Sequence, residues 1–276
     1  MAEQPWKQAA ELLALSEAIL ITAGAGMGVD SGLPDFRGVE GFWRAYPAFR
    51  KAGLRFESLA NPRLFESDPQ LAWGFYAHRL GLYRSVIPHQ GFRILSSLSA
   101  GRSRFVFTSN VDGHFQRSLC SEAEVYEVHG SIHHLQCTKP CCDLVWENRL
   151  ELSFDATTLR ARDPLPRCPH CHALARPNIL MFGDGSFVDS RADAQAAAFR
   201  AWLDQNLGKA LCVLELGAGT AIPTVRMLGE DLAKLGAGLI RINPRDASVP
   251  AGAISLRAGA LEALRQLQQS FEHASN

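Results

Sequence analysis

The sequence has no excess of charge of either sign. Its 276 residues carry 28 Lys and Arg side chains against 28 Asp and Glu side chains, which gives a formal net charge of zero. A balanced chain exerts no long-range attraction on nucleic acid or on an anionic membrane surface. We therefore expect a function that depends on a local site, with neither a membrane nor a nucleic acid as a direct partner.

The sequence also lacks long apolar runs and a recognisable secretory leader. Its longest apolar stretches, Ala18–Ala25 and Ala210–Leu216, are far shorter than a bilayer-spanning helix. Glu3 and Glu11 stand where a signal peptide would have basic and then apolar residues, so we expect none. The seven cysteines are an odd number, which argues against a disulfide framework and favours a reducing, cytoplasmic location.

Short apolar runs alternate with amphipathic segments along most of the chain. Apolar residues make up 47% and charged residues 20%, enough for a buried core. Strands are expected over 18–22, 104–108, 125–128, 210–216, 238–242 and 253–256. Helices are expected over 4–17, within 61–100, near 223–235 and from 260 to 271. This order predicts an α/β fold, a Rossmann-like parallel sheet with helices on both faces.

The composition changes over residues 131–180, which hold most of the cysteines and several prolines. We interpret this range as a small inserted zinc-binding module. Residues 1–130 and 181–276 would then form the Rossmann-like nucleotide-binding domain, with a helical insertion at about 38–100. The module and the helical insertion together would make a second, smaller lobe.

Two cysteine pairs in this range have the spacing of a metal site. Cys137 and Cys141 form a C-x3-C pair, and Cys168 and Cys171 form a C-x2-C pair. Four thiolates in this pattern predict a tetrahedral structural zinc, which would fold the lobe and leave no open position for chemistry. Cys142 could replace Cys141, and His170 and His172 are possible substitutes. Buried or free cysteines are the alternative.

A glycine-rich turn, Ala23–Gly28, follows the first predicted strand. Such a turn lets the backbone and a helix N-terminus approach a pyrophosphate. The pattern is not G-x-G-x-x-G, because Val29 stands where the third glycine would fall, and this disfavours a conventional dehydrogenase site. A tight turn without a ligand would explain the glycines equally well.

The residues after this turn carry a longer pattern. From Gly24 to Arg37 the sequence matches G-A-G-x-x-x-x-S-G-[IL]-P-D-F-R, and it resembles the sirtuins, the NAD-dependent protein deacylases, at every fixed position. Further segments are similar to sirtuin motifs in family order over residues 18–245: Thr108–Gly113 to T-Q-N-[IV]-D, Val128–Ser131 to H-G, Arg176–Asp184 to R-P-x-[IV] and F-G-E, and Ile242-Asn243 to I-N.

The resemblance, which is to bacterial-type sirtuins, implies a reaction and its partners. NAD and an acylated protein lysine would yield nicotinamide, free lysine and O-acyl-ADP-ribose. The family also carries a structural zinc in its small domain. In sirtuins the residue equivalent to His129 deprotonates a ribose hydroxyl, after the acyl oxygen has attacked the ribose C1′ and nicotinamide has left. A histidine can take a proton near neutral pH, as this role requires.

The resemblance assigns further roles residue by residue. Asn110 and Asp112 would act with His129 by orienting the ribose and nicotinamide, although an Asx turn is the simpler alternative. Phe182 and Gly183 would lie on the substrate loop. The remaining candidates are NAD contacts: Gly24, Ala25, Gly26, Asp35, Phe36, Arg37, Ser109, Gly217, Gly219, Thr220 and Asn243. Arg37 could grip phosphate and Phe36 could shield a ribosyl cation, or Asp35 and Arg37 could form a surface pair.

One predicted helix carries a candidate acyl-group receptor. Tyr76 and Arg79 are three residues apart and share a helical face, so a hydroxyl and a guanidinium could receive a carboxylate together. Phe75–Arg79 is similar to the F-Y-x-x-R string of the sirtuin subgroup that removes succinyl and malonyl groups. The alternative is a buried tyrosine beside a solvated arginine. Acetyl-lysine would still fit a pocket of that size.

One departure from the family pattern bears on activity. Ser109 stands where sirtuins usually have Gln, and the shorter side chain would admit water and favour NAD hydrolysis. A mono-ADP-ribosyltransferase or NADase on the same scaffold is therefore one alternative, and a non-enzymatic NAD-binding module is another. A zinc-knuckle nucleic-acid binder is disfavoured, because acidic residues offset the arginines of the cysteine module.

Overall fold

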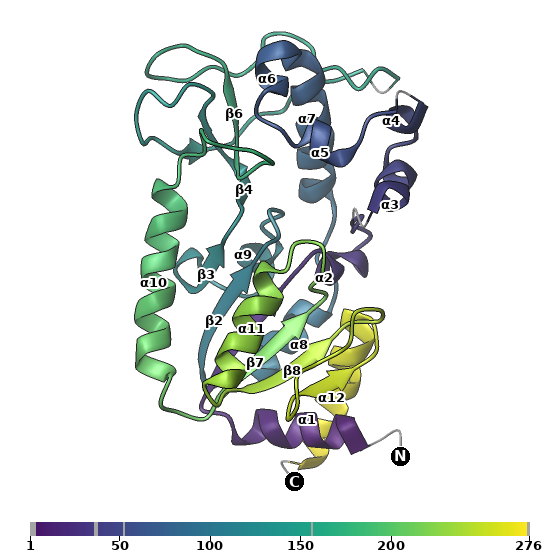
Figure 1. Ribbon diagram of the computed structural model, residues 1–276, viewed down its shortest axis with the longest axis vertical. Helices are drawn as coiled ribbons and strands as arrows, with labels where there is room; N and C mark the ends of the chain where they lie inside the picture. The colour runs from purple at the N-terminus through teal and green to yellow at the C-terminus, as the bar shows by residue number, and fades with distance from the viewer. Residues whose placement is uncertain (1–3, 36–37, 52, 156, 275–276) are drawn as a thin grey trace.

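The structure, a computed structural model, describes residues 4–35, 38–51, 53–155 and 157–274. Its centre is a six-stranded sheet in the order β3-β2-β1-β7-β8-β9 (Figure 1). Every pair of neighbouring strands in this sheet is parallel. The strands are β1 (Ala18–Ala23), β2 (Ser103–Thr108), β3 (Val125–Glu127), β7 (Leu211–Leu216), β8 (Gly238–Ile242) and β9 (Ile254–Leu256).

Helices cover both faces of this sheet, so the central strands β1 and β7 are buried at every residue. All six residues of β1 are buried, and alternate side chains enter opposite cores. Ile19 and Ile21 pack into the core on one face of the sheet, and Ala18 and Leu20 pack into the core on the other face. The first core is closed by α1 (Gln4–Leu15), α8 (Gly91–Leu98) and α12 (Ala260–Ala274), the second by α10 (Ser190–Asn206) and α11 (Thr224–Lys234). The predicted α/β class is confirmed.

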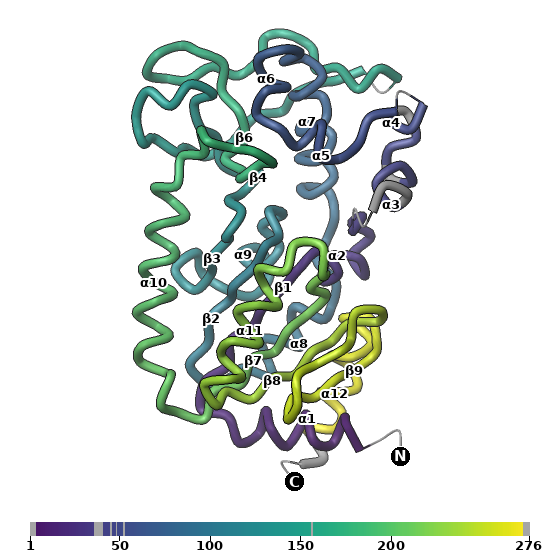
Figure 2. Tube along the Cα trace, in the orientation of Figure 1, coloured from purple at the N-terminus to yellow at the C-terminus, as the bar shows by residue number. Residues whose placement is uncertain are grey.

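A smaller unit lies beyond the carboxyl ends of the strands (Figure 2). It contains an antiparallel sheet of β5 (Trp146–Glu147), β4 (Gly130–Cys137) and β6 (Ala175–Ile179). Its helices are α3 (Gly38–Ala45), α4 (Pro47–Lys51), α5 (Phe56–Leu59), α6 (Leu64–Ser67) and α7 (Pro69–Ser85). A third core joins these helices to the small sheet, and Trp73 Nε1 donates to the Ala175 carbonyl at 2.9 Å.

The helical range predicted over 61–100 is divided into three helices. Asp68 ends α6 and caps α7, where its side chain accepts the Leu71 N–H at 3.2 Å and Pro69 occupies the first turn. Pro88 separates α7 from α8, and α8 packs on the large sheet rather than on the small unit. Three short elements complete the chain: α2 (Gly26–Val29), α9 (His114–Ser118) and a 3₁₀ turn at Glu122–Glu124.

No helix in the described part of the chain combines the length and the apolar character that a membrane crossing needs.

Candidate active site

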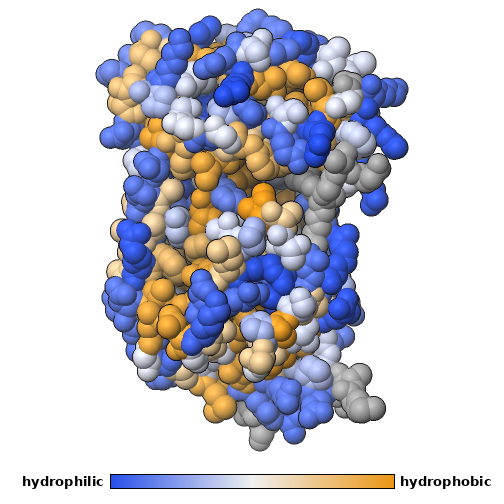
Figure 3. Space-filling view, viewed as in Figure 1, coloured by the Kyte–Doolittle hydropathy of each residue, from blue (hydrophilic) through white to orange (hydrophobic). Residues whose placement is uncertain are grey.

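A cavity of about 560 Å³ lies between the large sheet and the small unit. Its walls come from the glycine turn, the segment after β2, helix α7 and the loop after β6. Apolar surface gathers at mid-height on the face shown in Figure 3, between the two parts of the molecule. The predicted site residues that line this cavity are Gly24, Ala25, Asp35, Tyr76, Arg79, Ser109, Asn110, Asp112, His129, Phe182, Gly217 and Gly219.

The two glycine turns at the ends of β1 and β7 pack against each other. The Gly26 N–H donates to the Gly217 carbonyl at 3.0 Å. A Cβ atom on Gly24 would lie 2.8 Å from the Ala218 Cα, and one on Gly26 would lie 2.7 Å from the Gly217 Cα. Gly217 itself has φ +61°, a conformation that favours glycine. The glycines thus allow the two turns to pack closely. As a result, backbone from the ends of two strands lies in one wall of the cavity.

The segment after β2 is fastened to the first glycine turn. The Thr108 hydroxyl donates to the Ala23 carbonyl at 3.0 Å, and Asn110 Nδ2 donates to the Gly24 carbonyl at 3.0 Å. The Asp112 carboxylate accepts the His114 N–H at 2.9 Å, and the Asp112 carbonyl accepts a hydrogen bond from His133 Nε2 at 2.8 Å. The Asx turn that was the alternative for these residues is present at Asp112, and the Asn110 and Asp112 side chains also line the cavity.

His129 follows β3 and is held where β4 begins. Its carbonyl accepts the Leu180 N–H at 2.9 Å, and the next residue, Gly130, has φ +74°. A Cβ atom on Gly130 would lie 2.1 Å from the Asn178 carbonyl oxygen, so β6 can approach only a glycine here. Burial lowers the pKa of His129, and the nearby Ser109 carbonyl opposes that effect. The imidazole is therefore biased toward its neutral, basic form.

The direction of this pKa shift predicts the pH profile. Because burial disfavours the imidazolium, His129 stays neutral below its ordinary pKa of about 6.5. If His129 is the general base that the sirtuin resemblance implies, kcat/KM should therefore be flat through neutral pH and fall only as pH drops below about 6.5. A profile measured from pH 5 to 9 with a saturating second substrate checks this. An acidic limb centred above pH 7 would contradict the expected direction.

The loop after β6 is fixed by a buried ion pair. Arg176 Nη2 donates to Asp184 Oδ1 at 2.8 Å, and the two side chains are 1% and 0% exposed. Asp184 also accepts the Met181 N–H at 3.2 Å, so its carboxylate closes the loop on itself. Phe182 stands at the exposed tip, where its N–H donates to the Ala60 carbonyl at 3.0 Å and its ring packs on Phe56. The motif Arg176–Asp184 in the sequence does not by itself predict this ion pair.

Tyr76 and Arg79 are both buried on α7 and line the cavity. Arg79 is only 5% exposed, so the alternative of a solvated arginine is wrong. Within the described part of the chain the Tyr76 hydroxyl has no hydrogen-bond partner, and burial raises the pKa of Tyr76 to about 12. The hydroxyl therefore remains a donor at neutral pH. A buried donor without a partner beside a buried guanidinium is suited to an anionic ligand group.

Several predicted NAD contacts lie elsewhere. Gly26 lines a cavity of about 60 Å³ that shares Asp35 and Gly217 with the large one. Asp35 accepts Arg245 Nη2 at 2.7 Å, a bond between residues that sequence reasoning did not connect. Asn243 is fully buried, donates to the Ala218 carbonyl at 2.7 Å and lines neither cavity. Thr220 is also absent from both linings, and so is Gly183, which was predicted on the substrate loop. Two more, Phe36 and Arg37, lie outside the described residues.

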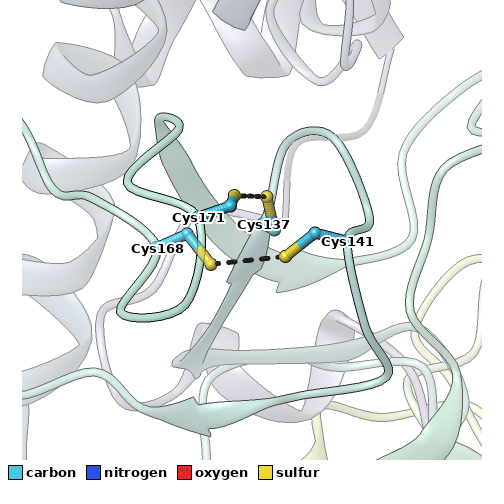
Figure 4. Close-up of side chains that lie close together, drawn as sticks. All are labelled: Cys137, Cys141, Cys168 and Cys171. Carbon is cyan, nitrogen blue, oxygen red and sulfur yellow. Dashed lines mark hydrogen bonds between the residues drawn. The ribbon is translucent and has the colours of Figure 1, made fainter.

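Four cysteines of the small unit, from the end of β4 and from nearby loops, point toward one another (Figure 4). The thiol sulfurs of Cys137, Cys141, Cys168 and Cys171 all lie within 4.8 Å of one another. The Cys137–Cys171 distance is 3.6 Å and the Cys141–Cys168 distance is 3.7 Å. A tetrahedral site with Zn–S bonds of about 2.3 Å has sulfur–sulfur edges of about 3.8 Å, so the cluster fits zinc. Cys142 is not in this group, but forms a second one with Cys141 and His170.

Comparison with known proteins decides the family. The model of the Sir2 family matches residues 24–200, the segment that contains both the glycine turn and His129. The chain belongs to the Sir2 family. One relative, the NAD-dependent protein deacylase 1 of Pseudomonas aeruginosa, is 32% identical over 239 residues, which cover 85% of this chain and 86% of the relative.

Solved Sir2 structures share the whole fold. A Sir2 homologue in complex with NAD is 25% identical with a TM-score of 0.74, and the match covers 98% of this chain and 94% of that one. A mutant Sir2 homologue in complex with 2′-O-acetyl ADP ribose is 28% identical with a TM-score of 0.70. That match covers 99% of this chain and 98% of the homologue. The similarity to Sir2 proteins therefore includes both the parallel sheet and the small unit.

Proposed function

We propose that this chain uses NAD to remove acyl groups from lysine side chains of proteins. The observation that carries the proposal is one cavity in which His129, Asn110 and Asp112 lie with both glycine turns. The Pseudomonas relative is named as a deacylase, and the Sir2 homologues bind NAD and an acetylated ADP-ribose. These relatives support the same reaction for this chain.

The cavity has features that suit NAD. Its volume falls in the range of cofactor sites, and its glycine walls let a pyrophosphate approach the backbone. When bound, NAD supplies the ribose carbon and the nicotinamide leaving group. Asn110 and Asp112 would hold the ribose and nicotinamide end, because both line the cavity directly after β2.

His129 is the one neutral base among the three proposed catalytic residues. It would take the proton from a ribose hydroxyl, and its lowered pKa keeps it able to do so at neutral pH. The buried Arg176–Asp184 pair would hold the loop that carries Phe182, so that an extended peptide could lie along it. The four cysteines would hold zinc and stabilise the small sheet without taking part in the reaction.

The acyl group would be acidic, such as succinyl or malonyl. Tyr76 and Arg79 line the cavity that His129 lines, and both are buried. An acyl chain that enters from the His129 side would place a terminal carboxylate near the guanidinium and the Tyr76 hydroxyl. The carboxylate would give the buried Arg79 a charged hydrogen-bond partner, whereas an acetyl group has no carboxylate to pair with it.

A stoichiometry experiment tests the reaction. The protein is incubated with NAD and a succinyl-lysine or acetyl-lysine peptide, and nicotinamide and free lysine peptide are both quantified. Deacylation predicts equal amounts of the two, with little nicotinamide in the tube without peptide. Ser109 lines the cavity, and its short side chain would admit water. Hydrolysis of NAD is therefore the alternative reaction that the experiment must distinguish. Nicotinamide release that does not depend on peptide would establish it.

Replacing Arg79 tests the acyl preference. Arg79→Met should lower the succinyl-to-acetyl ratio of kcat/KM by about 10- to 100-fold, because it removes a charge-assisted partner of the carboxylate. Arg84→Met, on the same helix but outside the cavity lining, is the matched control. The two substrates are compared with the same peptide sequence. An unchanged ratio in Arg79→Met would exclude Arg79 from acyl recognition.

A further inference from the structure

The Arg79 guanidinium is hydrogen-bonded to Tyr83, a neighbour on its own helix. The Tyr83 hydroxyl accepts hydrogen bonds from Arg79 Nε at 3.2 Å and from Arg79 Nη2 at 2.8 Å. Tyr83 is four residues further along α7, one helical turn away. It is 5% exposed and also lines the cavity of His129. One oxygen therefore holds one edge of the guanidinium inside the proposed acyl site.

The backbone of Tyr83 is held from outside α7. Arg117 of α9 donates from Nη1 to the Tyr83 carbonyl at 2.7 Å. Helix α9 directly follows Asp112, so this bond connects the acyl-site helix to the proposed NAD-binding segment. The Arg79 guanidinium also lies over the Tyr83 ring, 5.4 Å from its centroid. Both the hydroxyl and the ring of Tyr83 thus restrict the same guanidinium.

We propose that Tyr83 is a positioning residue for acidic acyl groups, one that orients Arg79 toward the carboxylate of the substrate. This inference rests on the proposed function, in which Tyr76 and Arg79 receive that carboxylate. A long arginine side chain loses considerable rotational freedom when it binds a ligand. Two hydrogen bonds to the buried Tyr83 hydroxyl reduce that freedom before the substrate arrives, so less affinity is lost on binding.

The chemistry of the hydroxyl agrees with this role. Burial raises the pKa of Tyr83, so the group stays neutral and its oxygen accepts hydrogen bonds without forming an ion pair that would compete for Arg79. After accepting two N–H groups, the hydroxyl retains its own proton as a donor. A carboxylate near Arg79 could accept that proton in a hydrogen bond. An acetyl group, which has no carboxylate, would gain nothing from either effect.

The test is Tyr83→Phe, which removes the oxygen and keeps the ring. Steady-state kinetics are measured with succinyl-lysine and acetyl-lysine forms of one peptide at saturating NAD. We expect the succinyl-to-acetyl ratio of kcat/KM to fall by about tenfold, mainly through a higher KM for the succinyl peptide. Tyr46→Phe is the matched control, because Tyr46 is also buried near Arg79 but bonds His78 at 3.1 Å and does not line the cavity.

The outcomes separate the two proposals. A ratio that falls in Arg79→Met but not in Tyr83→Phe would overturn the role of Tyr83 and leave the acyl site intact. Equal losses in Tyr83→Phe and Tyr46→Phe, or a loss of kcat on both peptides alike, would show a structural role and also overturn it. A wild-type protein that deacetylates but never desuccinylates would overturn the acidic acyl site and the role of Tyr83 together, while leaving the deacylase reaction in place.

Discussion

Replacing His129 with alanine should lower deacylation by at least about 100-fold, the lower end of what a positioned general base contributes. The expected loss is selective for one part of the reaction. In the proposed reaction His129 would act on a ribose hydroxyl after nicotinamide has left, so the variant should still exchange labelled nicotinamide into NAD when acyl peptide is present. Exchange and deacylation are measured on the same samples, with mass spectrometry for the peptide and radioactivity for NAD.

The matched control for this variant is His134→Ala. His134 is also a partly buried histidine of the same segment, on β4, but it does not line the cavity. It should keep deacylation within about threefold of wild type, as expected for a substitution outside the site. If His129→Ala deacylates at the wild-type rate, or if both variants lose activity equally, His129 is not the base.

Removing the zinc should have the second large effect. Structural zinc contributes about 10–16 kcal/mol of apparent binding free energy to small domains, and without it the cysteine module should unfold. The loss should reach the active site, because β4 runs from Gly130, the neighbour of His129, to Cys137, one of the four clustered cysteines. We therefore expect Cys171→Ser to contain little zinc, to unfold at a lower temperature and to lose most deacylation. Metal analysis, thermal unfolding and kinetics check the three parts.

Cys142→Ser is the control for the zinc prediction, and it also resolves the choice that the spacing left open. The thiol of Cys142 lies next to the four-cysteine group but is not a member of it. The variant should keep its zinc and its activity, whereas Cys141→Ser should lose both. The reverse result would assign the ligand to Cys142. Full activity in a zinc-free Cys171→Ser protein would contradict the structural role of the metal.

The sequence predicted the elements whose pattern is local. Each strand of the large sheet was found within about one residue, because a buried parallel strand is a short apolar run bounded by polar residues or glycine. The small sheet and α10 were not predicted. Strand β4 contains His133, His134 and Gln136, so it lacks an apolar run, and α10 is rich in alanine with only a weak apolar stripe.

The sequence motifs predicted which residues form the candidate site. They did not predict the contacts that hold those residues in place. Nothing local says that Gly26 must pack against Gly217, since the two are brought together only by the pairing of β1 with β7. The bond from Arg245 to Asp35 likewise depends on two distant loops. Tyr83 was visible at helical spacing from Arg79, yet only its buried position beside the cavity gives that spacing a meaning. The roles of these residues in binding and catalysis stay predictions.

Identification of the product tests the central claim most directly. A reaction of the wild-type protein with NAD and a succinyl-lysine peptide is stopped early and analysed by mass spectrometry for the acyl group. The account predicts succinyl-ADP-ribose in an amount equal to the free lysine peptide and to nicotinamide. Free succinate beside unmodified ADP-ribose, in a ratio that does not change at the earliest times, would show hydrolysis instead of transfer to the ribose and would contradict the account.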